Sequence, residues 1–449
     1  MTPLRRDRRV DAADAVALLY RRAGFGASPA ELQAALAAGY EATVVSWVAG
    51  LSSPDPGTAS LAPPTLTPYP VSFASLGAGS PARAQLETTL RREFPTLVQW
   101  WVARMMAATN PLTEKLPLLL HNQFPTAVSK VRFPSLMLGQ NAVFRQAGAG
   151  SFGALTVAVA KDPAMLIWLD ANSDHKAHPN ENFARELFER FTLGIGNYSQ
   201  ADVTAAAACF SGWRFDPRAG GFGFDAGDHD ATPQTVLGRS GVDTGEEVIA
   251  VATALAASAH WVVSRMWSFL AYPVATDDPV VSDLVPGYQS DLDMGRLLQA
   301  IFLHPQFASS TTVGGLVKQP VEWLAGALKA LGVSPASVVD GTVPVTGALA
   351  GLGQVPFDPP SVGGWPQNEG WLSTAATLAR WEAAARLARS PVVDISSVAD
   401  AAAGDRPDAA ATLLSVSWSS STAQALAQLA DDPAGLVTLA LVSPEYVSN

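Results

Sequence analysis

The chain is 449 residues long, and 48% of its residues are hydrophobic while only 15% are charged, which provides enough apolar side chains for a large core. Its formal net charge is −11, and phosphate binding requires clustered basic side chains, so we do not expect nucleic acid as a partner. We interpret the basic run of Arg5, Arg6, Arg8 and Arg9 as a solvated start of the chain.

No clean secretion signal follows this basic start, because residues 10–22 include Asp11, Asp14, Arg21 and Arg22 where an apolar stretch would be needed. No run of 18 apolar residues occurs along the chain, so the sequence predicts no transmembrane segment. The default expectation is therefore a cytoplasmic protein.

Helix signals dominate the N-terminal part. Ser28, Pro29 and Glu31 form a capping box with proline at the first helical position, and Gly39 closes the helix that they open. Prolines then punctuate residues 52–81, which we predict to be an irregular insertion. Pro95 should bend or break the helix that follows. The pattern predicts helices over residues 41–49, 83–108, 112–122, 152–160 and 163–170.

A helix is predicted over residues 199–211, and it contains Cys209. Because this is the single cysteine of the chain, an internal disulfide is excluded. Its position among alanines is typical of a buried thiol. Residues 213–216 and 222–225 flank a Pro/Gly turn and predict a small β-hairpin within a loop insertion over residues 213–245. Further helices are expected over residues 246–271, 292–303, 320–331 and 373–388.

The resulting fold class is mainly α. We predict one large helical domain over residues 1–390, with a small β-hairpin insertion and long Pro/Gly-rich loops such as residues 351–371. An Ala-rich helical tail, loosely attached, is expected over residues 391–449.

The densest polar chemistry lies in a predicted helix over residues 180–194. Phe183, Leu187 and Phe191 fall on one side of this helix. The other side carries Glu181, Asn182, Arg185, Glu186 and Glu189.

Two interpretations of this polar side stay open. The polar side could simply meet water, with Glu181 and Arg185 as an i,i+4 pair. Alternatively, it is a buried face whose carboxylates share a metal or transfer a proton.

The motifs of this chain resemble the bacterial "domain of unknown function 1800" family, in order, over roughly residues 13 to 390. The matching segments are residues 18–26, 162–170, 179–187, 191–194, 197–198, 202–203, 211–213, 318–322, 353–354, 359–360 and 363–366. The family has no settled biochemical activity, so the resemblance implies a fold and a site neighbourhood rather than a reaction. Family members often accompany a second uncharacterised, sulfatase-like family, and many look exported. The resemblance therefore suggests a sulfatase-like partner.

His121 ends an apolar run, and the family often carries a second histidine where this chain has Gln123. A complete His-x-His pair could bind a metal. Because the pair is incomplete here, a lone core histidine is the other interpretation, and a divalent metal cofactor cannot be assumed.

His229 and Asp230 also match a family motif, although Gln234 replaces the lysine expected there. Such a pair in a Gly-rich loop is consistent with turn chemistry or with a functional loop. His175 and His178 have the spacing of a metal pair, but the family shows no such pair, and we treat them as incidental.

Two tryptophans complete the candidate binding residues. Trp365 lies in a Gly-Gly-Trp-Pro turn and could be a structural lid or an aromatic platform for a ligand. The candidate substrate-binding set is Asn180, Glu181, Asn182, Glu189, Trp213 and Trp365.

We carry two hypotheses of function from the sequence. In the first, the protein is a hydrolase-like or metal-assisted enzyme, with Glu186 as general base or metal ligand and Arg185 holding an anionic group. His121, Glu186 and His229 should then converge on one cleft, with Asp230 beside them, in acid–base roles rather than as a tight zinc site. In the second, it is a non-catalytic binding or assembly protein whose polar helix is a buried structural network.

Overall fold

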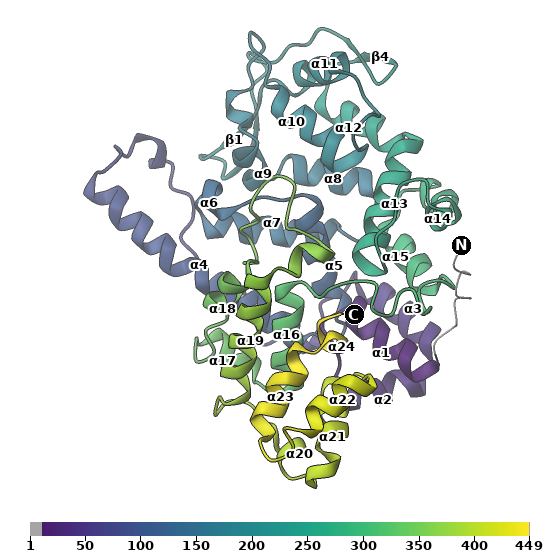
Figure 1. Ribbon diagram of the computed structural model, residues 1–449. Helices are drawn as coiled ribbons and strands as arrows, with labels where there is room; N and C mark the ends of the chain where they lie inside the picture. Colours follow the sequence, from purple (N-terminus) through teal and green to yellow (C-terminus); the bar gives the residue numbers. More distant parts are fainter. Residues whose placement is uncertain (1–10, 449) are drawn as a thin grey trace.

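The computed structural model describes residues 11–448 and is mainly helical, with two small two-stranded antiparallel sheets, as the sequence predicted (Figure 1). The basic run at residues 5–9 lies outside the described residues.

The first half of the chain, up to residue 210, is built from eleven α-helices among the described residues. Their bounds are α1 (Ala12–Arg22), α2 (Pro29–Ala38), α3 (Tyr40–Gly50), α4 (Pro81–Ala107), α5 (Leu112–Gln123), α6 (Val128–Val131), α7 (Pro134–Ala147), α8 (Phe152–Ala160), α9 (Pro163–Trp168), α10 (Glu181–Glu186) and α11 (Gln200–Phe210). The predicted capping box of Ser28 and Glu31 is confirmed at the start of α2, because each side chain bonds the other's backbone N–H.

The second half is also helical. Its helices are α12 (Gly245–Ala254), α13 (Ala256–Leu270), α14 (Pro279–Gln289), α15 (Met294–Leu303), α16 (Pro320–Ala330), α17 (Pro335–Val339), α18 (Val345–Leu352), α19 (Thr374–Ala388), α20 (Ser396–Ala399), α21 (Arg406–Leu414), α22 (Ser420–Ala427), α23 (Pro433–Val442) and α24 (Pro444–Val447). Short helical turns join them at η1 (Pro56–Thr58), η2 (Phe73–Ser75), η3 (Ala171–Ser173), η5 (Asn368–Trp371) and η6 (Ala403–Asp405).

Of the bend or break predicted at Pro95, the break is wrong, because α4 continues through this residue as one helix of 27 residues. Its second half is buried, from Leu97 to Met106, and this packing offsets the hydrogen bond that proline cannot donate. The proline-rich insertion before α4 is irregular, as predicted, and it fastens to α4. Trp100 donates its indole N–H to the Leu61 carbonyl at 3.1 Å, and Thr67 bonds the Glu93 carboxylate.

The predicted hairpin is confirmed as β1 (Trp213–Asp216) paired with β2 (Gly221–Phe224). A second hairpin, β3 (Gln234–Val236) with β4 (Arg239–Val242), was not predicted. Its strands are short and mostly exposed, so they lack the apolar alternation that identifies a strand in sequence. Its turn is formed by Leu237 and Gly238, both at positive φ, which is the backbone that a two-residue hairpin turn requires.

Two large hydrophobic clusters form the interior. The first joins α1, α3, α5, α8 and the helices from α10 to α15. The second joins α4, α16, α18, α19, α21 and α23, and it includes Phe25 from the loop after α1. Figure 1 shows α21 and α22 beside α1 and α2, so the two ends of the described chain meet.

The C-terminal segment belongs to the second cluster and is not a loosely attached tail. Leu436, Leu441 and Tyr446 are buried together with Trp323 of α16. The Trp323 indole donates to the Leu441 carbonyl at 2.8 Å, and the Lys318 N–H donates to the Val447 carbonyl at 2.8 Å. The C-terminal helices therefore share a hydrophobic cluster with helices that precede residue 390.

Within residues 11–448, no single helix is long and apolar enough to cross a membrane. Helices α12 and α13 together have the length and composition of a membrane-spanning segment, but the pair bends by 75° at the break between them.

Candidate functional site

The predicted helix over residues 180–194 is divided in the structure. Helix α10 ends at Glu186, and a π-helical turn, η4 (Leu187–Thr192), continues it. The wider turn brings the Thr192 hydroxyl to the Leu187 carbonyl at 2.6 Å, five residues back. The apolar side is buried as predicted, with Phe183, Leu187 and Phe191 in the first hydrophobic cluster.

Asn180 caps the start of α10 and connects it to the preceding loop by hydrogen bonds. Its side-chain oxygen accepts a hydrogen bond from the Asn182 N–H at 3.0 Å, which caps the helix. Its amide group donates to the Leu169 and Asp170 carbonyls and to the Ser173 hydroxyl. The amide of Asn182 has a single long bond, at 3.5 Å, to the Leu169 carbonyl.

Glu181 and Arg185 form the i,i+4 pair that the simpler interpretation expects, at 3.0 Å, and both side chains are more than a third exposed. Gln200 and Thr204 of α11 add hydrogen bonds to the same carboxylate. These bonds lower the pKa of Glu181, with the Thr204 hydroxyl as the largest cause. This part of the polar face is a solvated network between α10 and α11.

Glu186 differs from its neighbours because its Oε2 is buried and has no hydrogen-bond partner among the described residues. Burial raises its pKa above the usual range for a glutamate, and the neighbouring Glu189 adds to the effect. Glu189 itself accepts from the Tyr198 hydroxyl at 3.0 Å and pairs with Arg190 at 3.2 Å.

His121 is a core residue, 1% exposed, at the end of α5. Its Nε2 accepts a hydrogen bond from the Phe357 N–H at 3.0 Å, and its ring contacts Trp101, Phe144 and Trp365. Burial lowers its pKa to about 3, so the ring is neutral at physiological pH. This enclosure argues against the acid–base role that the sequence suggested.

Residues beside His121 hold its surroundings together. The Trp365 N–H donates to the Asn122 side chain at 2.8 Å, and the indole is buried against His121, so Trp365 serves as a lid on the core. Gln123, in the place of a second histidine, donates its amide to the Phe191 carbonyl at 2.9 Å and so fastens α5 to η4.

The loop with His229 and Asp230 is organised by Ser211. His229 Nδ1 lies 2.9 Å from the Ser211 carbonyl, and the Asp230 N–H donates to the Ser211 hydroxyl at 2.8 Å. The Asp230 carboxylate accepts from the Thr232 N–H at 3.0 Å, as in an ordinary Asx turn. Trp213 is buried between Phe210 and Phe222.

His175 was treated as incidental in the sequence, but in the structure its Nδ1 bonds the Asp228 carboxylate. Next to it, Asp174 accepts from the Asn180 N–H at 2.8 Å, and burial raises the pKa of Asp174 to about 7. Asp174 therefore links the start of α10 to Gly212, just before β1, because its carbonyl also accepts from the Gly212 N–H.

No hydrogen bond, ion pair or ring contact joins any two of His121, Glu186 and His229 in the part of the chain that the structure describes. Their convergence on one cleft stays a prediction. Among residues 11–448, no group of three or more His, Cys, Asp or Glu side chains is arranged to hold a metal ion.

A second polar constellation lies where α1, α5 and α16 meet, and the sequence analysis did not single it out. We call it the cationic cluster and define it as Arg21, Arg22, Lys115, Lys318 and Glu322. Four of its members are basic, and Arg22, Lys115, Lys318 and Glu322 are buried. Buried cations are costly unless they are paired, so this excess of positive charge requires an explanation.

Part of the positive charge of the cationic cluster is balanced by an acidic side chain or by carbonyl groups. Lys115 forms a buried salt bridge with Glu322 and also lies 3.5 Å from the Gly24 carbonyl. The other oxygen of Glu322 accepts from the Gln319 N–H at 3.1 Å, in a capping box at the start of α16. Arg22 donates to the Thr312 carbonyl, and burial lowers its pKa to about 9.

Lys318 is not balanced in this way. It is 6% exposed, and its ammonium has no hydrogen bond or ion pair to any described residue. It lies over the Tyr446 ring at 3.6 Å from the ring centroid. Burial lowers its pKa well below the usual lysine value, the nearby Arg21 lowers it further, and the Glu322 carboxylate acts in the opposite direction. The ring attracts the ammonium only weakly compared with a carboxylate.

The backbone around Lys318 is fixed from several sides. Arg380 of α19, itself buried, donates to the Lys318 carbonyl at 3.2 Å and to the Trp371 carbonyl at 2.8 Å. Gln354 accepts from the Val321 N–H and donates to the Gln319 side chain. The lysine therefore has a rigid base, and its position is set by segments far apart in sequence.

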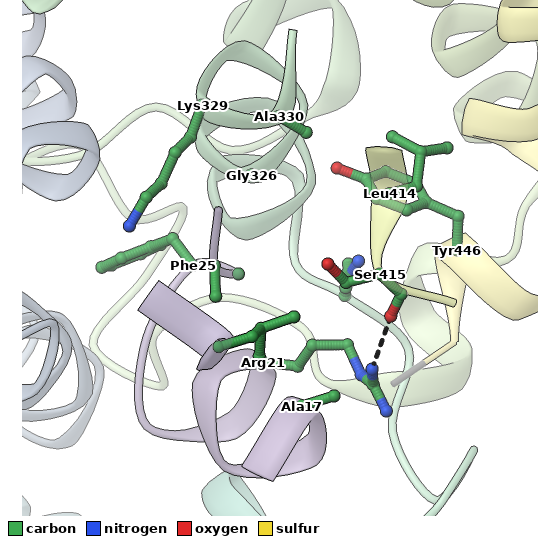
Figure 2. Close-up of a pocket in the computed structure, with 13 residues that line it drawn as sticks. Ala17, Arg21, Phe25, Gly326, Lys329, Ala330, Leu414, Ser415 and Tyr446 are labelled. Atoms are coloured by element: carbon green, nitrogen blue, oxygen red, sulfur yellow. Dashed lines mark hydrogen bonds between the residues drawn. The ribbon is translucent and has the colours of Figure 1, made fainter. Parts of the chain in front are cut away.

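A small pocket opens beside Lys318. It has a volume of about 20 Å³, room for one or two water molecules. Its lining includes Arg21, Phe25, Lys318, Lys329, Ser415 and Tyr446. Figure 2 shows the Arg21 guanidinium bonded to the Ser415 carbonyl, at 3.0 Å, with Phe25 and Lys329 on the opposite side. Lys329 is paired with Glu31 at 2.7 Å.

The fold and the two polar regions place this protein in the class of large helical proteins, with a pocket between the two ends of the described chain. The chain belongs to the family described as "Protein of unknown function (DUF1800)", whose model matches residues 18–448. The match extends beyond residue 390 and so includes the C-terminal helices that close the pocket. No curated protein and no solved structure matches the chain.

A signal for the cationic cluster was present in the sequence. Residues 18–26 and 318–322 were both recognised as family-like segments, and the basic residues Arg22 and Lys115 lie within apolar helical runs. Charged residues at apolar positions of a helix are expected to be paired or to have a function. That these segments share one site could be seen only once they were brought together.

Proposed function

We propose that this protein binds a small anionic group, a carboxylate or a phosphate, in the pocket beside Lys318. The observation that carries the proposal is Lys318, a buried residue that lines the pocket and whose ammonium makes no hydrogen bond or ion pair to a described residue. Arg21 lines the same pocket, and two further cations of the cluster lie behind it. An anion there would gain charge-assisted hydrogen bonds and offset the mutual repulsion of the cations.

The proposal is tested with the Lys318→Met variant, using inorganic phosphate and acetate as probes. A ligand that binds the folded state raises the melting temperature in proportion to its saturation. We expect at least one probe to stabilise the unmodified protein, and we expect Lys318→Met to lose about tenfold or more in affinity for it, because a charged hydrogen bond is removed.

The matched control is Lys130→Met, because Lys130 is an exposed lysine of α6 paired with Asp170. This variant should keep the stabilisation by the probe. Without ligand, Lys318→Met should be at least as stable as the unmodified protein, since an unpaired buried charge is removed. If neither probe raises the melting temperature of the unmodified protein, the proposal is wrong.

A second candidate function is acid–base chemistry, hydrolytic or metal-assisted, on the polar face of α10. One observation favours it: the buried Oε2 of Glu186 lacks a partner among the described residues, and burial raises the pKa of the carboxyl group, as suits a general base. Arg185 and the His229–Asp230 loop would assist it. The competing hypothesis is a network that only stabilises the helical core.

Thermal melts of Glu186→Gln and Arg185→Met separate these two hypotheses. A catalytic carboxylate can be replaced with little loss of stability, whereas removing one member of a buried charged network costs about 3–5 kcal/mol. Because Arg185 is more than a third exposed, we expect both variants to melt close to the unmodified protein. Strong destabilisation of both would favour the structural network.

A further inference from the structure

The pocket beside Lys318 is the inner end of a longer groove. The groove has a volume of about 790 Å³. It shares four lining residues with the inner pocket: Ala17, Arg21, Leu32 and Ser415. The inner pocket admits little more than a terminal group, and the groove is large enough for the rest of a small ligand. A ligand whose anionic end reaches Lys318 would therefore extend along α1 into the groove.

Charge changes sign along this path. Asp14, Ala17 and Arg21 all line the groove and are spaced i, i+3 and i+7 on α1, so they form one ridge of the helix. Asp14 is exposed, and its carboxylate makes no hydrogen bond or ion pair to a described residue, although it acts on Arg21, whose pKa it raises. Glu445 of α24 also lines the groove, but its carboxylate already accepts hydrogen bonds from the Ser419 N–H and the Thr422 hydroxyl. The end of the groove at Arg21 is therefore positive, and the end at Asp14 is negative.

Helix α1 sets the spacing of Asp14 and Arg21 along its axis. Seven residues at 1.5 Å per residue separate Asp14 from Arg21 by about 10 Å along the helix axis. An extended chain of three amino acids spans about 10 Å, at 3.3–3.6 Å per residue. The lining of the groove also includes the polar side chains of Gln33, Thr412 and Ser417. These are suitable partners for peptide N–H and C=O groups.

We infer that the ligand is a zwitterion of about tripeptide length, with its carboxylate at Arg21 and Lys318 and its ammonium at Asp14. The inference rests on the proposed function, since the same cations hold the carboxylate. It adds the class of ligand, its length and its direction in the groove. Leu36 and Val313, which are exposed at the groove, provide apolar surface for the side chains of the ligand.

The test compares trialanine with N-acetyl-trialanine and with alanine by calorimetric titration of the full chain. Trialanine has both charges at the inferred separation, the acetylated form lacks the ammonium, and alanine has both charges too close together. The unmodified protein should bind trialanine about fivefold more tightly than either of the other probes, since exposed ion pairs contribute modestly. In Asp14→Asn, trialanine and N-acetyl-trialanine should bind equally.

The control variant is Glu41→Gln, which removes an exposed acidic residue of α3 outside the groove, and it should keep the preference for trialanine. Three results separate the inference from the proposed function. If acetate or phosphate binds but trialanine has no advantage over its acetylated form, the zwitterion is wrong and the anion pocket stands. If alanine binds as tightly as trialanine, the inferred length is wrong. If no anion binds, both proposals fail.

Discussion

At the scale of single residues, burial decides which charge a side chain carries. His121 and Lys318 are both deeply buried basic groups, and burial lowers the pKa of each. Their surroundings differ, because His121 is enclosed by aromatic rings and bonded to a backbone N–H, whereas Lys318 faces a pocket. The first environment stabilises a neutral ring in the core. The second leaves room for an anion.

His121 leads to a prediction about acid stability. Its pKa is about 3 in the folded protein and about 6.5 when unfolded, so between these values only the unfolded chain binds the proton. The stability that depends on the neutral ring is complete above pH 6.5 and is lost as the pH falls. From pH 7 to pH 5 this loss is about 2 kcal/mol, at 1.36 kcal/mol per pH unit below 6.5.

Urea unfolding of His121→Gln at pH 7 and pH 5 measures this contribution, because glutamine can still accept the Phe357 hydrogen bond but does not titrate. The variant should lose about 2 kcal/mol less than the unmodified protein between the two pH values. His260→Gln, a change at a partly exposed histidine of α13, should leave the difference unchanged. Equal losses in His121→Gln and the unmodified protein would contradict the prediction.

At the scale of elements, α10 depends on its cap more than on its charged pairs. Asn180 closes the helix start and also ties the loop at residues 169–173 to it through its amide group. Glu181 and Arg185 lie on the exposed side and contribute little, as is usual for surface ion pairs.

We therefore expect Asn180→Ala to lower the free energy of unfolding by about 1–2 kcal/mol, at the upper end of measured cap losses. Asn182→Ala is the matched control, because its amide makes one bond of 3.5 Å and its loss should have a smaller effect. Denaturant titration of both variants gives the comparison. If both substitutions lower the free energy of unfolding by the same amount, Asn180 does not stabilise the start of α10 in the way assigned to it.

At the scale of the whole molecule, the two ends of the described chain build the pocket together. Helix α1 provides Arg21, and the C-terminal helices provide the Ser415 carbonyl and the Tyr446 ring. Helix α16 lies between them, and Lys318 lies in the segment just before its cap. A ligand in the pocket would contact all three and would stabilise the closed arrangement.

The packing of the C-terminal segment is tested with Leu441→Ala. Leu441 is fully buried in the second cluster, and truncating a buried leucine costs about 2–5 kcal/mol. Leu378→Ala removes an exposed leucine of α19 and should change stability by less than about 0.5 kcal/mol. The free energies of unfolding of the two variants should therefore differ clearly. A small effect of Leu441→Ala would mean that the tail is loosely attached after all.

The sequence by itself determined the helical class, most helix positions, the capping box at Ser28 and the first hairpin, because these depend on periodicity and on local hydrogen bonds. It also identified the family, since the matching segments occur in order along the chain. It did not show the π-helical turn after Glu186 or the continuity of α4 through Pro95. Both depend on packing against distant residues.

Only the tertiary structure decided which polar residues are solvated, which are enclosed and which share a site. Glu181 and Arg185 were predicted as site residues but are exposed, whereas Arg22 and Lys318 were not predicted as site residues and are buried. The physical reason is that burial and charge pairing are sums over neighbours from many segments. The cationic cluster joins residues near positions 21, 115 and 318, and Ser415 and Tyr446 line its pocket. No local sequence pattern predicts that these distant segments come together.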